Sequence, residues 1–350
     1  MRSWRSAPFL LAAVAVAALA ADPPPLPEAA AKCLAEFRAA DWSQRLRPQR
    51  PDPAPEVWKA RVRAEWELGA LDPAHRVTLE ALLADEDRFV RALAARSLGV
   101  LGDEASSPAL VEALVQERDK GTRIALVEAL GRTGGAGALE AVEAEQKAGA
   151  DVDVSFAVGI ARRQLKGGRW DLASLRAEHE EARTAPLAAA AVGQPAPEIA
   201  LPSAAGPVNL STRRGKVVVL VFSLGDRGDK GTKVLQRLGS QFEQLGRLGA
   251  HVVVVAPHEK ERTDAWAQRM RLPEGTFTVC SDPAARAQAA YGVARQLFVK
   301  GEWMPSPGWF VVDPKGKLVW ARVGTRDGDE PSLGDLLPVL DDVSRGIALR

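Results

Sequence analysis

Two different patterns of apolar positions divide the chain. From about residue 55 to residue 167, apolar residues recur every three or four positions, with charged residues between them. From residue 192 onward, short uninterrupted runs of β-branched residues take their place. The first pattern is typical of amphipathic helices, and the second of strands that are buried on both faces. We therefore expect a helical region over 55–167, a helix and linker over 168–191, and an α/β domain over 192–350.

The helical region repeats itself at an interval of about thirty residues. Its clearest copies read RVRAEWELGALD, RALAARSLGVLG and RIALVEALGRTG, and all three share a Leu-Gly pair in register. The copies cover 61–72, 91–102, 123–134 and, in degraded form, 154–167. Second amphipathic helices, at 107–115 and 136–145, lie between them. Because one hairpin cannot cover its own apolar face, we expect the hairpins to stack and bury one another.

The repeated strings resemble HEAT-type repeats. Val90-Arg91, Ala94-Ala95 and Leu98-Gly99 carry the resemblance. The glycine of each Leu-Gly pair is interpreted as a helix C-cap, since glycine adopts the left-handed backbone of a C-cap without strain. The resemblance implies a surface for protein partners. An ordinary helical bundle that repeats by chance is the alternative.

The second half alternates strands with helices. The most apolar run, KVVVLVF at 216–222, predicts a central strand, and HVVVVA at 251–256 predicts a second one. A third strand is expected at 277–280 and a hairpin over 309–323. Helices are expected over 232–248, 259–270, 283–291 and 333–343. This order predicts a thioredoxin-like α/β sandwich.

Several strings of this half, taken in order, resemble the AhpC/TSA (peroxiredoxin-like) branch of the redoxin superfamily. They are VGQPAPEIALP at 192–202, RRGKVVVLVFSLGDRGDKGTK at 213–233 and FVVDPKG at 310–316. The resemblance implies a thioredoxin fold and, as the family activity, thiol-dependent reduction of peroxides.

The residues that perform this chemistry are absent. In the family, a cysteine in the first turn of the helix after the first central strand attacks the peroxide as a thiolate, and a threonine and an arginine lower its pKa. The resemblance places that cysteine at Gly231, the threonine at Gly228, a loop proline at Leu224 and the arginine at Pro307. Aligned instead with a thioredoxin CxxC motif, the cysteines fall at Arg227 and Lys230. Neither alignment supplies sulfur, so we expect no catalytic residue here.

The chain has two cysteines, Cys33 and Cys280. Cys280 is the one remaining candidate for a catalytic thiol, although a small buried apolar residue is the simpler interpretation. If the protein is exported, a disulfide between the two cysteines is possible. Thioredoxin-like proteins also carry a cis-proline beside the active loop, and the resemblance places it at Pro307.

The composition of the chain argues against several other classes of function. The 46 basic and 45 acidic residues nearly cancel, so a nucleic-acid partner is not expected. The four histidines have no metal-ligand spacing. We expect neither a metal nor a cofactor. The glycine-rich loop at 225–231 could hold an anion, but Asp226 and Asp229 oppose this, and a plain turn is favoured. His258 is interpreted as part of a strand-end loop.

The N-terminus has the features of a secretory signal peptide. Arg2 and Arg5 precede an apolar run over 9–21 that contains Ala18-Leu19-Ala20. The run is too short for a membrane-spanning helix, which needs about 20 residues, although an uncleaved anchor is the alternative. We expect a signal peptide over 1–20, a proline-rich segment over 21–54, no membrane span after cleavage, and a periplasmic or extracellular location.

These observations favour an exported binding or assembly module whose redoxin domain has lost its chemistry. One alternative is an active thiol oxidoreductase that uses Cys280, with Cys33 as its partner. In another alternative the helical array performs the function and the redoxin fold is a spacer.

Overall fold

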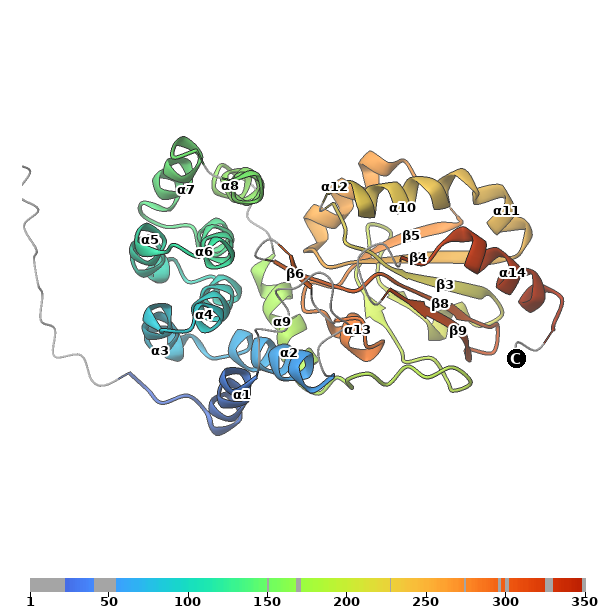
Figure 1. Ribbon diagram of the computed structural model, residues 1–350, viewed down its shortest axis with the longest axis horizontal. Helices are drawn as coiled ribbons and strands as arrows, with labels where there is room; N and C mark the ends of the chain where they lie inside the picture. Colours follow the sequence, from blue (N-terminus) through green and yellow to red (C-terminus); the bar gives the residue numbers. More distant parts are fainter. Residues whose placement is uncertain are drawn as a thin grey trace, which may run out of the picture.

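The computed structural model describes residues 23–40, 55–149, 151–167, 171–226, 228–273, 275–294, 297–299, 302–324 and 330–347. The expected signal peptide lies outside the described residues, as do residues 21–22 and 41–54 of the proline-rich segment. Figure 1 shows two parts side by side, a stack of helices and a sheet covered by helices. The predicted fold class, a helical repeat array followed by a thioredoxin-like sandwich, is confirmed.

Two rows of antiparallel helices form the array. The inner row consists of α2, α4, α6 and α8, and the outer row of α3, α5 and α7 (Figure 1). The helices are α1 (Glu28–Ala39), α2 (Pro55–Gly69), α3 (Arg76–Ala81), α4 (Arg88–Leu101), α5 (Ser107–Gln116), α6 (Lys120–Thr133), α7 (Ala138–Lys147), α8 (Val152–Leu165) and α9 (Leu172–Ala182). One continuous apolar core runs through α1 to α8.

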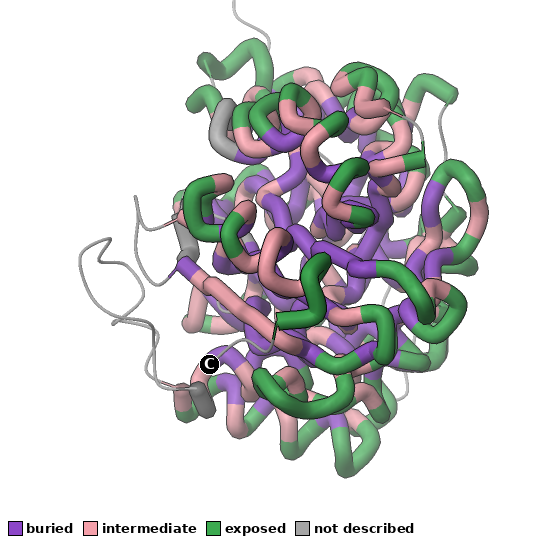
Figure 2. Tube along the Cα trace, turned by 90° about the vertical axis from the view of Figure 1, so that its right-hand side faces the viewer, coloured by how far each residue is buried: buried purple, intermediate pink, exposed green. Residues whose placement is uncertain are grey.

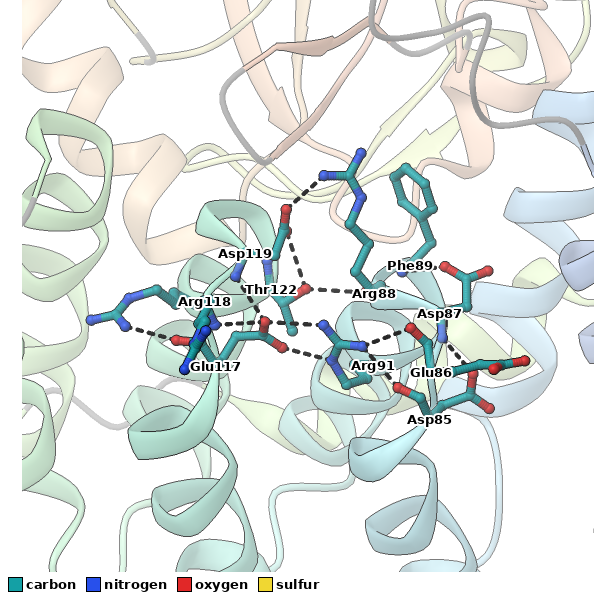
Figure 3. A network of polar contacts seen from close by, with 11 residues as sticks. Asp85, Glu86, Asp87, Arg88, Phe89, Arg91, Glu117, Arg118, Asp119 and Thr122 are labelled. Carbon is teal, nitrogen blue, oxygen red and sulfur yellow. Dashed lines mark hydrogen bonds and ion pairs between the residues drawn. The ribbon is translucent and has the colours of Figure 1, made fainter.

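An ion-pair ladder links the inner helices. Asp87, Asp119 and Asp151 each begin an inner helix as N-cap and accept a backbone N–H of its first turn. The residue after each of the first two caps reaches the next cap: Arg88 Nη1 lies 2.7 Å from Asp119, and Lys120 Nζ lies 3.3 Å from Asp151. Figure 3 shows the ion pair between Arg88 and Asp119. The caps therefore both start the helices and fix the stacking of one repeat on the next.

The Leu-Gly glycines are not C-caps, and that prediction is wrong. Gly99 and Gly131 lie inside α4 and α6, which end instead at Gly102 and Gly134, both with positive φ. A Cβ atom at Gly99 would lie 3.1 Å from the Cα atom of Ala129, and one at Gly131 would lie 2.8 Å from the Cα atom of Ala161. The two glycines therefore let neighbouring inner helices approach closely.

Replacing Gly131 with alanine should destabilise the array. The clash with the backbone of α8 should cost about 1–3 kcal/mol, which exceeds the roughly 1 kcal/mol that alanine gains in a helix. Gly159→Ala is the matched control, because a Cβ atom there would meet nothing within 4 Å. Thermal unfolding should show a lower Tm for Gly131→Ala and an equal or higher Tm for Gly159→Ala. Equal shifts in the two variants would show that close helix packing is not the reason for Gly131.

The second part is built on a five-stranded sheet of order β5-β4-β3-β8-β9, in which β3, β4 and β5 are parallel and β8 and β9 are antiparallel to their neighbours. The strands are β3 (Val217–Phe222), β4 (Ala250–Ala256), β5 (Phe277–Ser281), β8 (Gly308–Val312) and β9 (Leu318–Val323). The helices are α10 (Gly228–Ser240), α11 (Phe242–Arg247), α12 (Lys260–Met270), α13 (Arg286–Ala290) and α14 (Leu333–Ser344). Two small hairpins complete it, namely β1 (Ala200–Leu201) with β2 (Val208–Asn209), and β6 (Leu297–Val299) with β7 (Glu302–Met304). The single helix expected over 232–248 is divided between α10 and α11, and the β6–β7 hairpin was not predicted.

Alternate side chains of each central strand enter different cores. Val217, Val219 and Val221 pack under helices α10, α12 and α14. The intervening residues of β3 pack against the β1–β2 hairpin and α13 on the other face. Figure 2 shows buried residues through the middle of the molecule and exposed turns around them. No helix in the described part of the chain is long and apolar enough to cross a membrane.

A buried cluster joins the array to the sheet domain. It contains Trp58, Val62 and Trp66 of α2, together with small residues around α13. The indole Nε1 of Trp66 donates a hydrogen bond of 2.6 Å to the backbone carbonyl of Ala284. The two parts therefore share a core.

Candidate functional site

The end of β3 and the first turn of α10 enclose a small cavity. Gly231 is buried there, and Leu224, Pro307 and Trp309 also line the space, which is about 20 Å³. This volume is enough for about one water molecule. The structure thus brings together three positions that the sequence singled out, Leu224, Gly231 and Pro307. The described peptide bonds are all trans, so the cis form that the resemblance implied for Pro307 is wrong.

The backbone itself fills the space beside Gly231. A Cβ atom at this position would lie 2.3 Å from the carbonyl oxygen of Gly225, well inside van der Waals contact. Gly225 has a φ of 67°, and a Cβ atom on it would lie 2.1 Å from Nε2 of His258. The loop therefore closes by contact between two glycines, and no side chain fits at residue 231 without a shift of the backbone.

Asp226 anchors this loop to α12. Its Oδ1 atom accepts hydrogen bonds from Nη2 of Arg262 at 2.6 Å and from Nε at 3.0 Å, and His258 Nε2 lies 3.1 Å away. Burial alone would raise the pKa of the Asp226 carboxyl, but the contact with His258 and the charge of Arg262 outweigh burial and hold that pKa well below its usual range. The loop is therefore more than the plain turn that the sequence favoured. Arg262 of α12 binds the loop's own carboxylate, Asp226.

The helical array contacts the same edge of the sheet domain. Arg132 of α6 donates a hydrogen bond of 2.9 Å from Nε to Glu259, the neighbour of His258. The Arg262 guanidinium lies 5.3 Å from the centre of the Phe156 ring of α8. Between the two parts is a polar cavity of about 110 Å³, lined by charged groups of both signs. Sequence reasoning could not find these contacts, because Arg132 and Glu259 are 127 residues apart in the chain.

Comparison with known proteins identifies both parts of the chain. Residues 192–321 match the model of the AhpC/TSA family. They form an AhpC/TSA domain. Residues 76–152 match HEAT repeats. Both resemblances drawn from the sequence are confirmed.

Among the known proteins that the chain resembles are several peroxiredoxins. The chain is 28% identical to the chloroplastic peroxiredoxin Q of Triticum aestivum over 136 residues, which are 39% of this chain and 59% of that protein. It is 31% identical to the chloroplastic peroxiredoxin Q of Sedum lineare over 110 residues, 31% of this chain and 56% of that protein. A solved peroxiredoxin-like protein from Aquifex aeolicus is 17% identical, with a TM-score of 0.40, over 45% of this chain and 92% of that one. The chain thus spans less than two thirds of each of these two plant relatives.

The AhpC/TSA domain buries its one cysteine. Cys280 lies in β5 with 0% of its surface exposed, in the core on the β1–β2 side of the sheet, whereas α10 packs on the opposite side. Burial raises the pKa of the Cys280 thiol to about 12. Cys33 is half-buried in α1 and packs against the core of the array. Both cysteines are free, so the disulfide considered from the sequence is not formed.

Cys280 should resist alkylation in the native protein. With iodoacetamide at pH 8, we expect Cys33 to be modified slowly and Cys280 only after urea unfolds the chain, since the reactive species is an accessible thiolate. Peptide mass spectrometry of the alkylated protein separates the two sites. Modification of native Cys280 at the rate of Cys33 would show that the thiol is open to solvent.

The described residues contain no cluster of three or more histidine, cysteine or acidic side chains arranged to hold a metal ion.

His251 forms hydrogen bonds at both ring nitrogens, with the Gly275 carbonyl and with the Thr278 hydroxyl. Burial lowers its pKa to about 4, so it is neutral at pH 7 and its role is structural.

Proposed function

We propose that the AhpC/TSA domain of this chain does not reduce peroxides and that the protein is an exported binding or assembly module. Peroxide reduction by this family requires a cysteine thiolate that attacks the peroxide and is oxidised. The family resemblance places that cysteine at Gly231. Without sulfur there, polar groups of the loop could bind a peroxide but could not accept its oxygen.

The geometry of Gly231 carries this proposal. If only the cysteine had been lost, the space for its side chain would remain. Instead, the carbonyl oxygen of Gly225 occupies the place where a Cβ atom would lie, at 2.3 Å. Two basic side chains beside this loop are also engaged, because Arg262 and His258 both contact Asp226. The loop is held in a shape that suits a structural role.

The burial of Cys280 argues against the alternative thiol oxidoreductase. Its thiol would have to reach both the peroxide and a reductant, yet it is fully buried and its pKa is far above neutral. A direct assay decides between the two. Full-length protein is mixed with hydrogen peroxide and dithiothreitol, and peroxide loss is followed against a protein-free blank. We expect the wild-type rate to equal the blank. Turnover that Cys280→Ser abolishes would establish the oxidoreductase instead.

A protein partner would contact the outer row of the array. The inner row faces the AhpC/TSA domain, so it is covered within the chain itself (Figure 1). A groove of about 410 Å³ lies between α3 and α5, with Leu83, Ala109 and Ala113 among the residues of its wall and Glu112 at its exposed side. A photo-crosslinking amino acid at Glu112 should yield a discrete adduct in the native host, whereas the same group at Asp342 on α14 should not. Equal yields of adduct at both positions would show that the outer row is not the docking face.

Export rests on the sequence of residues 1–20. N-terminal sequencing of the protein recovered from its native host should begin near Ala21 or Asp22. Secreted protein that begins at Met1 would contradict cleavage.

A further inference from the structure

A second, larger cavity lies between α9 and the AhpC/TSA domain. It is about 490 Å³ and runs between α9, the β1–β2 hairpin and the start of α12. Figure 1 shows α9 between the array and the sheet domain. Leu172, Leu175, Leu201 and Pro207 give it apolar walls. Both its volume and its place at a domain boundary are typical of sites that bind small organic molecules.

Glu178 is the half-buried carboxylate of this groove that has no counter-ion among the described residues, whereas Asp171 and Glu261, which also line the groove, are exposed. The carboxylates of Glu181 and Glu259 also line the groove, but the first pairs with Arg286 and the second with Arg132. Glu178 is half-buried and makes no hydrogen bond or ion pair with any residue in the described part of the chain. A carboxyl group withdrawn from water without a partner is unfavourable.

The charges that face Glu178 are mainly negative. The acidic groups are Glu181 on the same helix, Glu259 before α12 and Asp282 after β5. The cations are Arg286 of α13 and Lys260 of α12, and Lys260 pairs with Asp264. Burial, and next the charge of Asp282, raises the pKa of Glu178 to about 8. The groove therefore combines apolar walls with a cluster of acidic side chains at one point, of which Glu178 alone is half-buried without a cationic partner. A ligand that carries a positive charge on an apolar body complements both features.

We propose that this groove binds a small organic cation, an ammonium group on an apolar body, with the ammonium paired to Glu178 and the apolar body against Leu172, Leu201 and Pro207. This site is separate from the cavity at Gly231, and it does not depend on whether the domain reduces peroxide.

Isothermal titration calorimetry of the full chain tests the site with three probes of equal length, hexylammonium, hexanol and hexanoate. We expect hexylammonium to bind at least tenfold more tightly than either of the others. Glu178→Gln keeps the shape of the side chain and should weaken hexylammonium binding at least tenfold. Glu180→Gln, on the exposed side of the same helix, should leave binding unchanged.

Proton release gives a second readout. At pH 7 the free Glu178 carboxyl is mostly protonated, because its pKa is raised above that pH, and pairing with an ammonium requires the ionised form. Binding should therefore release close to one proton, measured from the dependence of the heat on the ionisation enthalpy of the buffer, and affinity should rise between pH 6 and pH 8. Both effects should disappear in Glu178→Gln.

A variant that blocks the groove tests the site independently of whether Glu178→Gln folds correctly. Ala177 is exposed and lines the groove, so Ala177→Phe should fill the groove without disturbing the core and should abolish binding. Equal affinity for hexanol and hexylammonium would overturn the proposal, as would unchanged binding in Glu178→Gln or the absence of hexylammonium binding at millimolar concentration.

Discussion

Gly231→Ala should unfold at a lower temperature than the wild-type protein by several degrees. The added Cβ atom would lie 2.3 Å from the carbonyl oxygen of Gly225, and this oxygen belongs to the backbone, so it cannot rotate away. Overpacking of this kind costs about 1–3 kcal/mol, which outweighs the roughly 1 kcal/mol that alanine gains over glycine in a helix. Thermal unfolding followed by circular dichroism measures the change.

Gly246→Ala in the neighbouring helix α11 is the control. A Cβ atom there would meet no atom closer than 4.0 Å, so alanine should be neutral or stabilising. If Gly231→Ala were as stable as Gly246→Ala, the loop would have room for a side chain. The physical argument for a closed site would then fail.

Trp66→Ala should separate the two parts of the chain. Trp66 is 3% exposed, packs in the cluster that joins α2 to the region of α13, and donates a hydrogen bond to the carbonyl of Ala284. Truncation of a buried tryptophan costs about 3–5 kcal/mol, and here much of the loss falls on the contact between array and sheet domain. Calorimetry should show two resolved unfolding transitions in Trp66→Ala, the first at a lower temperature than the single transition of the wild type.

Val115→Ala serves as the control for this variant, because Val115 on α5 is 78% exposed and its truncation removes little buried surface. Its unfolding profile should match that of the wild type. A single transition at the wild-type temperature in Trp66→Ala would mean that the two parts do not depend on each other. It would also mean that the array could be deleted without harm to the AhpC/TSA domain.

The periodicity of the chain was enough to predict both folds. The Leu-Gly strings recur at an interval of about thirty residues, and the β-branched runs at 216–222 and 251–256 form β3 and β4. Local patterns of this kind depend only on which faces of an element are buried. The wrong prediction of C-caps shows what such patterns cannot predict. Glycine suits both a left-handed cap and a close helix crossing, and only the position of Ala161 shows that Gly131 serves the second purpose.

The candidate site was only partly predictable. The absence of sulfur at Gly231, Arg227 and Lys230 is visible in the sequence alone. The contact of Gly231 with the backbone of Gly225 is not, because it depends on the path of the loop. Likewise, Asp226 looked like an ordinary turn residue, since its partners Arg262 and His258 follow more than thirty residues later.

The array and the AhpC/TSA domain meet at the edge where the family resemblance places the active site. Phe156 of α8 contacts Arg262, which holds Asp226, and Arg132 of α6 contacts Glu259, the neighbour of His258. An edge that would otherwise be open to substrate and reductant is therefore partly covered by the chain's own repeats. This arrangement supports the proposed assembly role, under which other proteins would contact the outer row of the array.

Peroxide consumption by Gly231→Cys in the full-length chain is the most direct test of the closed loop. The variant restores sulfur at the position where the family resemblance expects it, and stopped-flow measurement with hydrogen peroxide and dithiothreitol compares it with the wild type. Both proteins should consume peroxide no faster than the protein-free blank, since the loop cannot admit the side chain in a reactive geometry. Rapid turnover by Gly231→Cys at the wild-type unfolding temperature would show that the loop still has an open site for the nucleophile.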